Sequence, residues 1–237
     1  LKKEIYIIFL SIVFFIIGKF LFNGWADGLV AVYFSISALL MYLLFVNDEE
    51  EKNLLYYFLA FCFFTTLTLI KNEGIALLSI LFIVTLIIKI LKGKFKKNLN
   101  KFIYLLFSFI PIILWKYFCY SNGIENDYIN SDFLNNLLPR INDFENIKLI
   151  AYFLFLNEKF LISLIFILVV FWLKKNLDLL LYISAINFFY ILIISLIFLS
   201  TPVDFYFQLD SAAARIIKSI NFCLAFFTLY NLNKKKI

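Results

Sequence analysis

Histidine is absent from this 237-residue chain, charged residues make up only 16% of it, and its three cysteines show no CxxC spacing. The lack of histidine excludes Ser-His-Asp and Cys-His nucleophiles and His-ligated zinc or haem. The scattered cysteines, Cys62, Cys119 and Cys223, disfavour a disulfide framework or a zinc site. Any chemistry therefore depends on carboxylates, Lys, Arg or Tyr, or on a carboxylate-bound divalent cation such as Mg²⁺ or Mn²⁺.

Soluble domains carry roughly 25% charged residues, so this chain has too little polar surface to fold in water. Apolar residues make up 64% of it and occur in long continuous runs. Such runs, of about 20 residues, cross the ~30 Å of a bilayer core as helices, whereas barrel strands would be shorter and alternating. The sequence predicts an all-α polytopic membrane protein, with residues 1–237 as a single transmembrane domain. The eight expected spans are Glu4–Phe22, Leu29–Val46, Leu54–Ile70, Ile75–Leu91, Phe102–Tyr120, Lys159–Leu173, Leu177–Leu199 and Ala214–Leu232.

The basic residues indicate an orientation. Lys-rich segments such as Lys92–Lys101 and Lys234–Lys236 fall in alternate loops, and the other loops hold only scattered cations. By the positive-inside rule both termini are expected in the cytoplasm. The net charge of +6 thus reflects membrane topology, and the absence of any nucleic-acid motif speaks against a nucleic-acid partner.

Two candidate positions lie in short outward-facing turns. Asp27 begins the second span, where it either caps the helix or orients a substrate hydroxyl or a metal. Lys71 and Glu73 lie in the minimal turn between the third and fourth spans. Placing a charge near the lipid is costly. We therefore expect either a partner for Lys71 and Glu73, with a phosphate as the candidate partner of Lys71, or a turn that is exposed to solvent.

The segment 121–158 is the only long polar loop. Its Phe133, Leu134, Leu137 and Leu138 form one apolar stripe, as in a helix that lies in the interface plane. Pro139 is expected to end this helix, and Arg140 then follows as a candidate phosphate ligand. Such a helix either covers a lipid-linked substrate or is purely structural.

The last outward segment, residues 200–213, carries Asp204 and Asp210, and Arg215 is expected to open the next helix. A cation at a helix N-terminus opposes the helix dipole. A lipid phosphate or a neighbouring carboxylate would explain Arg215, because guanidinium binds such anions bidentately. Lys116 and the other cations within spans are expected to reach an interface rather than to bind substrate.

These segments together resemble a known family. The Ala26-Asp27 pair, the T-x-x-K-x-E-G turn at residues 68–74 and the S-T-P-x-D…S-x-x-x-R pattern over residues 200–215 are similar to the type C glycosyltransferases, bacterial polytopic enzymes related to protein mannosyltransferases and aminoarabinose transferases. The resemblance implies transfer of a sugar from a polyprenyl-phosphate-linked donor on the outer face of the bacterial cytoplasmic membrane. Since the first outward loop is short and the chain begins with Leu1, we expect the C-terminal part of a longer enzyme, with the principal catalytic acid upstream.

In this interpretation Lys71, Arg215 and Arg140 hold the donor phosphate. The catalytic candidates, which would position the acceptor or a divalent ion, are Asp27, Glu73, Asp204 and Asp210. Two other functions stay open at this stage: a surface-polysaccharide polymerase or ligase, and a transporter or flippase. A transporter would predict helices broken at mid-membrane and internal repeats.

Overall fold

The computed structural model describes residues 26–47, 54–94, 96, 99–124, 133–156, 158–174, 176–202 and 204–233. Of these residues 92% are helical and none lies in a strand, which confirms the all-α class. The first expected span, residues 4–22, and residues 125–132 of the long loop lie outside the described residues. The elements are α2 (Ala26–Met41), η2 (Tyr42–Val46, a π-helix), α3 (Leu54–Ile70), α4 (Asn72–Leu91), α5 (Leu99–Leu106), η3 (Phe107–Phe109), α6 (Ile110–Ser121), α7 (Phe133–Asn142), α8 (Phe144–Phe155), α9 (Glu158–Lys174), α10 (Leu177–Ser200) and α11 (Phe205–Asn233).

A helix occupies each expected span from the second to the eighth. Among the described residues, five segments are long and apolar enough to cross a membrane, as befits an integral membrane protein: Ala26–Val46, Asn72–Leu91, Leu99–Ser121, Leu177–Ser200 and Phe205–Leu232. The helices α3 and α9 have 17 residues each. At 1.5 Å per residue they extend about 25 Å, slightly less than the ~30 Å bilayer core.

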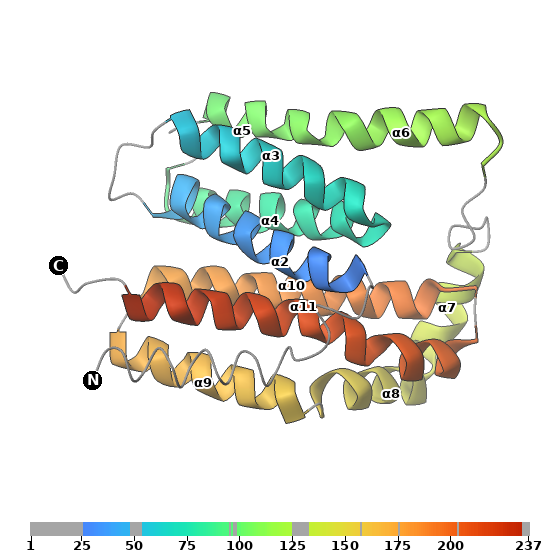
Figure 1. Cartoon of the computed structure of the whole chain (residues 1–237). Coiled ribbons are helices and arrows are strands. Elements are labelled where there is room, and N and C mark those ends of the chain that lie inside the picture. Colours follow the sequence, from blue (N-terminus) through green and yellow to red (C-terminus); the bar gives the residue numbers. More distant parts are fainter. Residues whose placement is uncertain are drawn as a thin grey trace.

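The long helices lie side by side as a bundle, with the collinear α5 and α6 along one edge and α8 and α9 end to end along the other (Figure 1). The helices α2 and α11 pack against each other in the middle, α3 and α4 cover α2, and α8 and α9 cover α11. Successive long helices run in opposite directions, with α5 and α6 counted as one length and α8 and α9 as another, so the helix ends gather at two ends of the bundle. We call them the hairpin end, where the chain passes from α3 to α4, and the lysine end, where α4 ends just before Lys92.

Buried aromatic side chains pack three helices together near the lysine end of the bundle. Tyr42, Tyr182 and Phe227 come from η2, α10 and α11, and their ring centroids lie 5.5 to 6.2 Å apart. The Tyr182 hydroxyl donates a hydrogen bond of 3.1 Å to the Ala38 carbonyl oxygen. Aromatic pairs in such tilted and edge-to-face arrangements stabilise a core beyond the burial of their area, so three helices are fixed at one level.

Two expectations about helix boundaries are wrong. The helix α11 begins at Phe205 rather than at Ala214, because Asp204 caps it by accepting a hydrogen bond of 2.8 Å from the Phe207 amide. Pro139 lies inside α7 instead of ending it. The residues just before the sixth expected span form a helix of their own, α8, whose N-terminus is capped by Asp143.

Candidate functional site

The connection between α3 and α4 is a tight hairpin. Lys71 alone separates the two helices, with an extended backbone (φ −158°, ψ 151°). Gly74 then lies so close to α3 that a Cβ at this position would be 1.9 Å from the Leu67 carbonyl oxygen. The absence of a side chain at Gly74 therefore allows the two helices to meet, and it fixes Lys71 and Glu73 at the hairpin end.

Four charged side chains from three helices and this turn converge there. The Lys71 Nζ atom lies 2.6 Å from Asp27 Oδ1 and 3.1 Å from Glu73 Oε1, and Arg215 Nη1 lies 3.6 Å from Asp27 Oδ2. We call Asp27, Lys71, Glu73 and Arg215 the charge cluster. It contains two carboxylates and two cations, and its charges balance.

Burial differs sharply within the charge cluster. The Asp27 side chain is 9% exposed, whereas those of Lys71, Glu73 and Arg215 are 35%, 33% and 32% exposed. Asp27 thus lies beneath the other three, with one cation at each of its carboxylate oxygens. The first turn of α2 also favours a carboxylate, through the positive end of the helix dipole. Asp27 is thus the buried member that contacts both cations, and the other three side chains are partly exposed.

The electrostatics of the cluster keep Lys71 protonated. Burial by itself lowers the pKa of Lys71, but the hydrogen bond from its ammonium to Asp27 and the negative charges of Glu73 and Asp27 outweigh that effect, so the pKa rises above its ordinary value of 10.5. Opposite charges within about 4–6 Å favour the charged form. Lys71 is therefore a fixed cation at neutral pH and not a proton donor.

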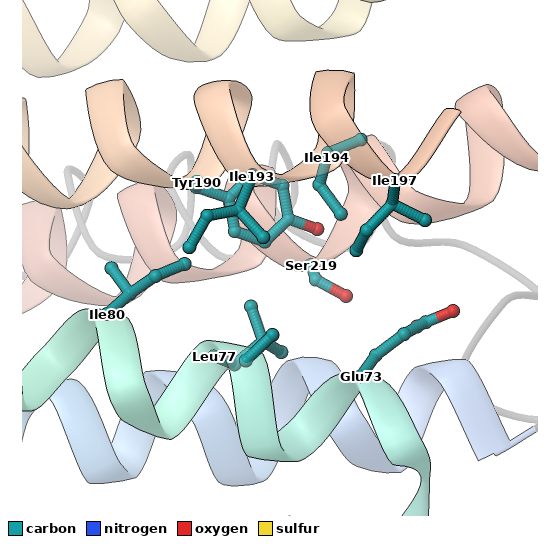
Figure 2. A pocket seen from close by; sticks show the side chains of 9 residues that line it. Glu73, Leu77, Ile80, Tyr190, Ile193, Ile194, Ile197 and Ser219 are labelled. Atoms are coloured by element: carbon teal, nitrogen blue, oxygen red, sulfur yellow. The ribbon is translucent and has the colours of Figure 1, made fainter. Parts of the chain in front are cut away.

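A narrow crevice opens beside the cluster, between α4 and α10. Figure 2 shows Leu77 and Ile80 of α4 facing isoleucines of α10, with Glu73 at one end. Ser219 and Tyr190 contribute the other polar groups, and the Tyr190 hydroxyl already donates a hydrogen bond of 2.6 Å to the Ile216 carbonyl oxygen. The crevice thus has one charged end and aliphatic walls, and α4 and α10 must separate before anything larger than a water enters.

Three of the residues predicted from the sequence lie apart from the cluster. The Arg140 guanidinium caps the C-terminal end of α10, donating hydrogen bonds of 3.4 Å and 2.8 Å to the carbonyl oxygens of Leu199 and Thr201. It also lies 5.4 Å from the Phe205 ring centroid. Asp204 caps α11 as described above, and Asp210 is exposed on α11. For Arg140 and Asp204 the structure thus gives a helix-capping role.

Arg215 belongs to the cluster, but for a different reason than its expected place at a helix N-terminus. It lies well inside α11, which begins at Phe205, so the helix dipole does not oppose it. Its Nε atom donates a hydrogen bond of 3.1 Å to the Ser211 carbonyl oxygen, one turn earlier. The partner that accounts for Arg215 is Asp27.

The described residues do not fit a divalent metal ion. Among them no three Asp, Glu, Cys or His side chains lie together. The two carboxylates of the charge cluster, Asp27 and Glu73, share Lys71 as a common partner. A fixed ammonium between two carboxylates neutralises the charge that Mg²⁺ or Mn²⁺ would need.

The sequence interpretation missed two features of the site. Ser219 lies one turn after Arg215 on α11, so helical spacing alone could have placed both on the same face. Lys116 of α6 does not simply extend to an interface, because it donates a hydrogen bond of 2.7 Å to Asn72 Oδ1 beside the cluster. Comparison with protein-family models, curated proteins and solved structures found no match for the chain.

Proposed function

We propose that this protein is a membrane glycosyltransferase that moves a sugar from a polyprenyl-phosphate-linked donor to an acceptor at the hairpin end of the bundle. The observation that carries the proposal is the convergence of Asp27, Lys71, Glu73 and Arg215. The resemblance over residues 26–27, 68–74 and 200–215 adds the substrate class, because members of that family use lipid-linked sugars.

The proposal includes an orientation in the membrane. Eight crossings with both termini in the cytoplasm would place the lysine end inside, in agreement with the positive-inside rule. The hairpin end, and the charge cluster with it, would then face outward from a bacterial cytoplasmic membrane and take part in building the cell envelope. The arrangement of helix ends in Figure 1 is consistent with this alternation for the described helices.

The main catalytic demand in such a reaction is stabilisation of the departing lipid phosphate. Lys71 and Arg215 are both about one-third exposed and are held on Asp27, so their charges are positioned before substrate arrives. Preorganised charge of this kind avoids reorganisation during reaction. In our proposal these two cations bind the donor phosphate, and Asp27 positions them.

Glu73 is the better placed of the two carboxylates to receive a proton. It has one cationic partner, is 33% exposed and lines the crevice, whereas Asp27 is buried beneath two cations. The acceptor hydroxyl oxygen would form a bond to the sugar anomeric carbon, and the bond from that carbon to the phosphate oxygen would break. The hydroxyl proton would pass to Glu73, and the lipid phosphate would leave with the electron pair.

The test uses the full-length protein in lipid nanodiscs with radiolabelled polyprenyl-phosphate-linked sugars. Arg215→Ala is expected to lower turnover about 10²–10³-fold, the usual effect of removing one preorganised stabilising group. Glu73→Gln should lower turnover with little change in donor binding, because it removes only the proton acceptor. Unchanged turnover in both variants would contradict the assigned roles.

Matched controls come from the same chain. Asp210→Asn removes an exposed carboxylate of α11, and Lys148→Ala removes an exposed cation 3.5 Å from Glu145. Both should retain turnover. Label that passes into a growing polysaccharide would favour the polymerase or ligase alternative.

A second candidate, a transporter or flippase, is favoured by one observation. The helices α8 and α9 lie end to end and both pack on α11 (Figure 1). Interrupted helices are typical of transporter substrate sites. The same nanodisc protein, reconstituted in vesicles, distinguishes the two: a flippase moves the intact lipid-linked sugar across the bilayer, and its sugar–phosphate bond stays intact.

A further inference from the structure

A second polar site lies on the flank of the hairpin, facing α6. Lys116 is half-buried on α6, and its ammonium donates a hydrogen bond of 2.7 Å to the side-chain oxygen of Asn72. Asn72 is the first residue of α4 and lies between Lys71 and Glu73 in sequence. The contact therefore joins α6 to the hairpin across the end of α3, on which α6 packs.

The charge of Lys116 is not balanced within the described residues, where Asn72, a neutral amide, is its hydrogen-bond partner. An ammonium has three N–H donors and an amide has two. After their mutual contact, two donors of Lys116 and both donors of Asn72 are left in the described structure. Together they present four N–H groups and one positive charge, which is the donor set that phosphate oxygens accept.

The surroundings of Lys116 indicate the depth of this site. On either side of it along α6, Trp115 is 52% exposed and Tyr120 is 86% exposed, and the rings of Trp115 and Phe118 stack with centroids 5.7 Å apart. Trp and Tyr are enriched where the hydrocarbon core meets the headgroups. The last two turns of α6 therefore fit the headgroup level, where lipid phosphates lie.

We propose that Lys116 and Asn72 bind the phosphate of an anionic membrane lipid, on the flank of the hairpin that faces α6. Lys116 supplies the charge and Asn72 the additional hydrogen-bond donors. This site is independent of sugar transfer, because it involves no residue to which we assign a catalytic or donor-binding role. It would hold the α3–α4 hairpin and α6 together through the bound headgroup.

The experiment uses Trp115 as a local reporter in the protein carrying Trp25→Phe and Trp172→Phe. The protein is placed in nanodiscs of phosphatidylcholine that contain a small fraction of brominated phosphatidylglycerol or, for comparison, brominated phosphatidylcholine. A single basic residue near the surface attracts anionic headgroups about fivefold. We therefore expect brominated phosphatidylglycerol to quench Trp115 as though enriched about fivefold over its bulk fraction.

Variants of Lys116 decide the proposal. Lys116→Gln keeps a donor for Asn72 but removes the charge, so the preference for phosphatidylglycerol should disappear, and Lys116→Arg should restore it. Lys148→Gln, which removes a cation on α8, should leave the preference for phosphatidylglycerol unchanged. The proposal is overturned if both lipids quench Trp115 equally in the parent protein, or if the preference persists in Lys116→Gln.

Free phosphate offers the same hydrogen-bond acceptors as a lipid headgroup, so it is the other ligand to test. Inorganic phosphate, exchanged for chloride at constant ionic strength, should leave the quenching unchanged if the site binds lipid headgroups. Loss of the preference in phosphate buffer would show a site for free phosphate and would overturn the assignment to a lipid. A melting temperature for each variant separates loss of binding from loss of the fold.

Discussion

Replacing Gly74 with alanine tests the packing that creates the charge cluster. The new Cβ would lie 1.9 Å from the Leu67 carbonyl oxygen and 2.8 Å from its carbonyl carbon, whereas ordinary van der Waals contact begins at 3.4 Å. The helices α3 and α4 must therefore separate by about 1.5 Å at this point. Because the obstacle is backbone, no rotamer change relieves the contact.

Two opposing effects set the magnitude. Overpacking costs typically 1–3 kcal/mol, and a rigid backbone obstacle places Gly74→Ala near ~3 kcal/mol. Alanine in a helix regains about 1 kcal/mol relative to glycine. The net loss is about 2 kcal/mol, which corresponds to a fall of roughly 4–8 °C in melting temperature for a chain of this size. Helix propensity alone predicts the opposite sign.

The assay is thermal unfolding in detergent, combined with a mutant cycle. A shift of about 1.5 Å would stretch the 2.6 Å contact between Lys71 and Asp27 beyond hydrogen-bond distance. Asp27→Asn should then destabilise Gly74→Ala less than it destabilises the parent protein, because contacting residues are non-additive. A Gly74→Ala protein that melts at or above the parent temperature would refute the close-packing argument.

Gly93 provides the control. It has a left-handed backbone (φ +66°), and nothing lies within 4 Å of a Cβ at this position. Gly93→Ala should lose only the roughly 1–2 kcal/mol of the left-handed conformation. Its combination with Asp27→Asn should be additive, because Gly93 follows the opposite end of α4.

Further predictions concern Lys71 and Arg140. Because the folded-state pKa of Lys71 is raised, its stabilising contribution is fully present below the ordinary pKa of 10.5 and is lost as the pH rises through the folded value. The difference in melting temperature between the parent protein and Lys71→Met should therefore be constant from pH 7 to 9 and should shrink above pH 10.5; a difference that grows with pH would contradict the ion-pair geometry. Arg140→Ala should cost about 1.5–3 kcal/mol, since it removes hydrogen bonds from a charged donor, and hydrogen exchange should increase in α7, which packs on α10. Lys148→Ala, at an exposed ion pair, should lower the free energy of unfolding by less than about 1 kcal/mol. If Arg140→Ala and Lys148→Ala had equal effects, the capping role of Arg140 would be excluded.

The sequence located the helices well because hydrophobic runs are a local signal. The expected spans Leu54–Ile70 and Leu177–Leu199 match α3 and α10 to within one residue. Helix boundaries near polar residues were harder. The start of α11 depends on Asp204 acting as a cap, and the T-P-x-D pattern before it is a helix-start signal.

Local signals pointed to the candidate residues one by one: the cost of charges near lipid for Lys71 and Glu73, and the helix dipole for Asp27 and Arg215. The structure brings these four together, whereas Arg140, a candidate from the long loop, caps α10 instead. Local signals cannot separate the two outcomes. A buried carbonyl group at a helix end and a carboxylate on another helix both satisfy an arginine, and the choice depends on which helices are neighbours.

By itself the sequence determined that the chain is helical, that it belongs in a membrane, and that its Lys-rich segments fall in alternate loops. These properties follow from composition and from periodicity within single segments. Only the tertiary structure decided that Asp27 lies beneath Lys71 and Arg215, that Gly74 fits against the Leu67 carbonyl, and that Lys116 reaches Asn72. Each of these contacts joins different helices, so the packing of α2, α4, α6 and α11 defines the site.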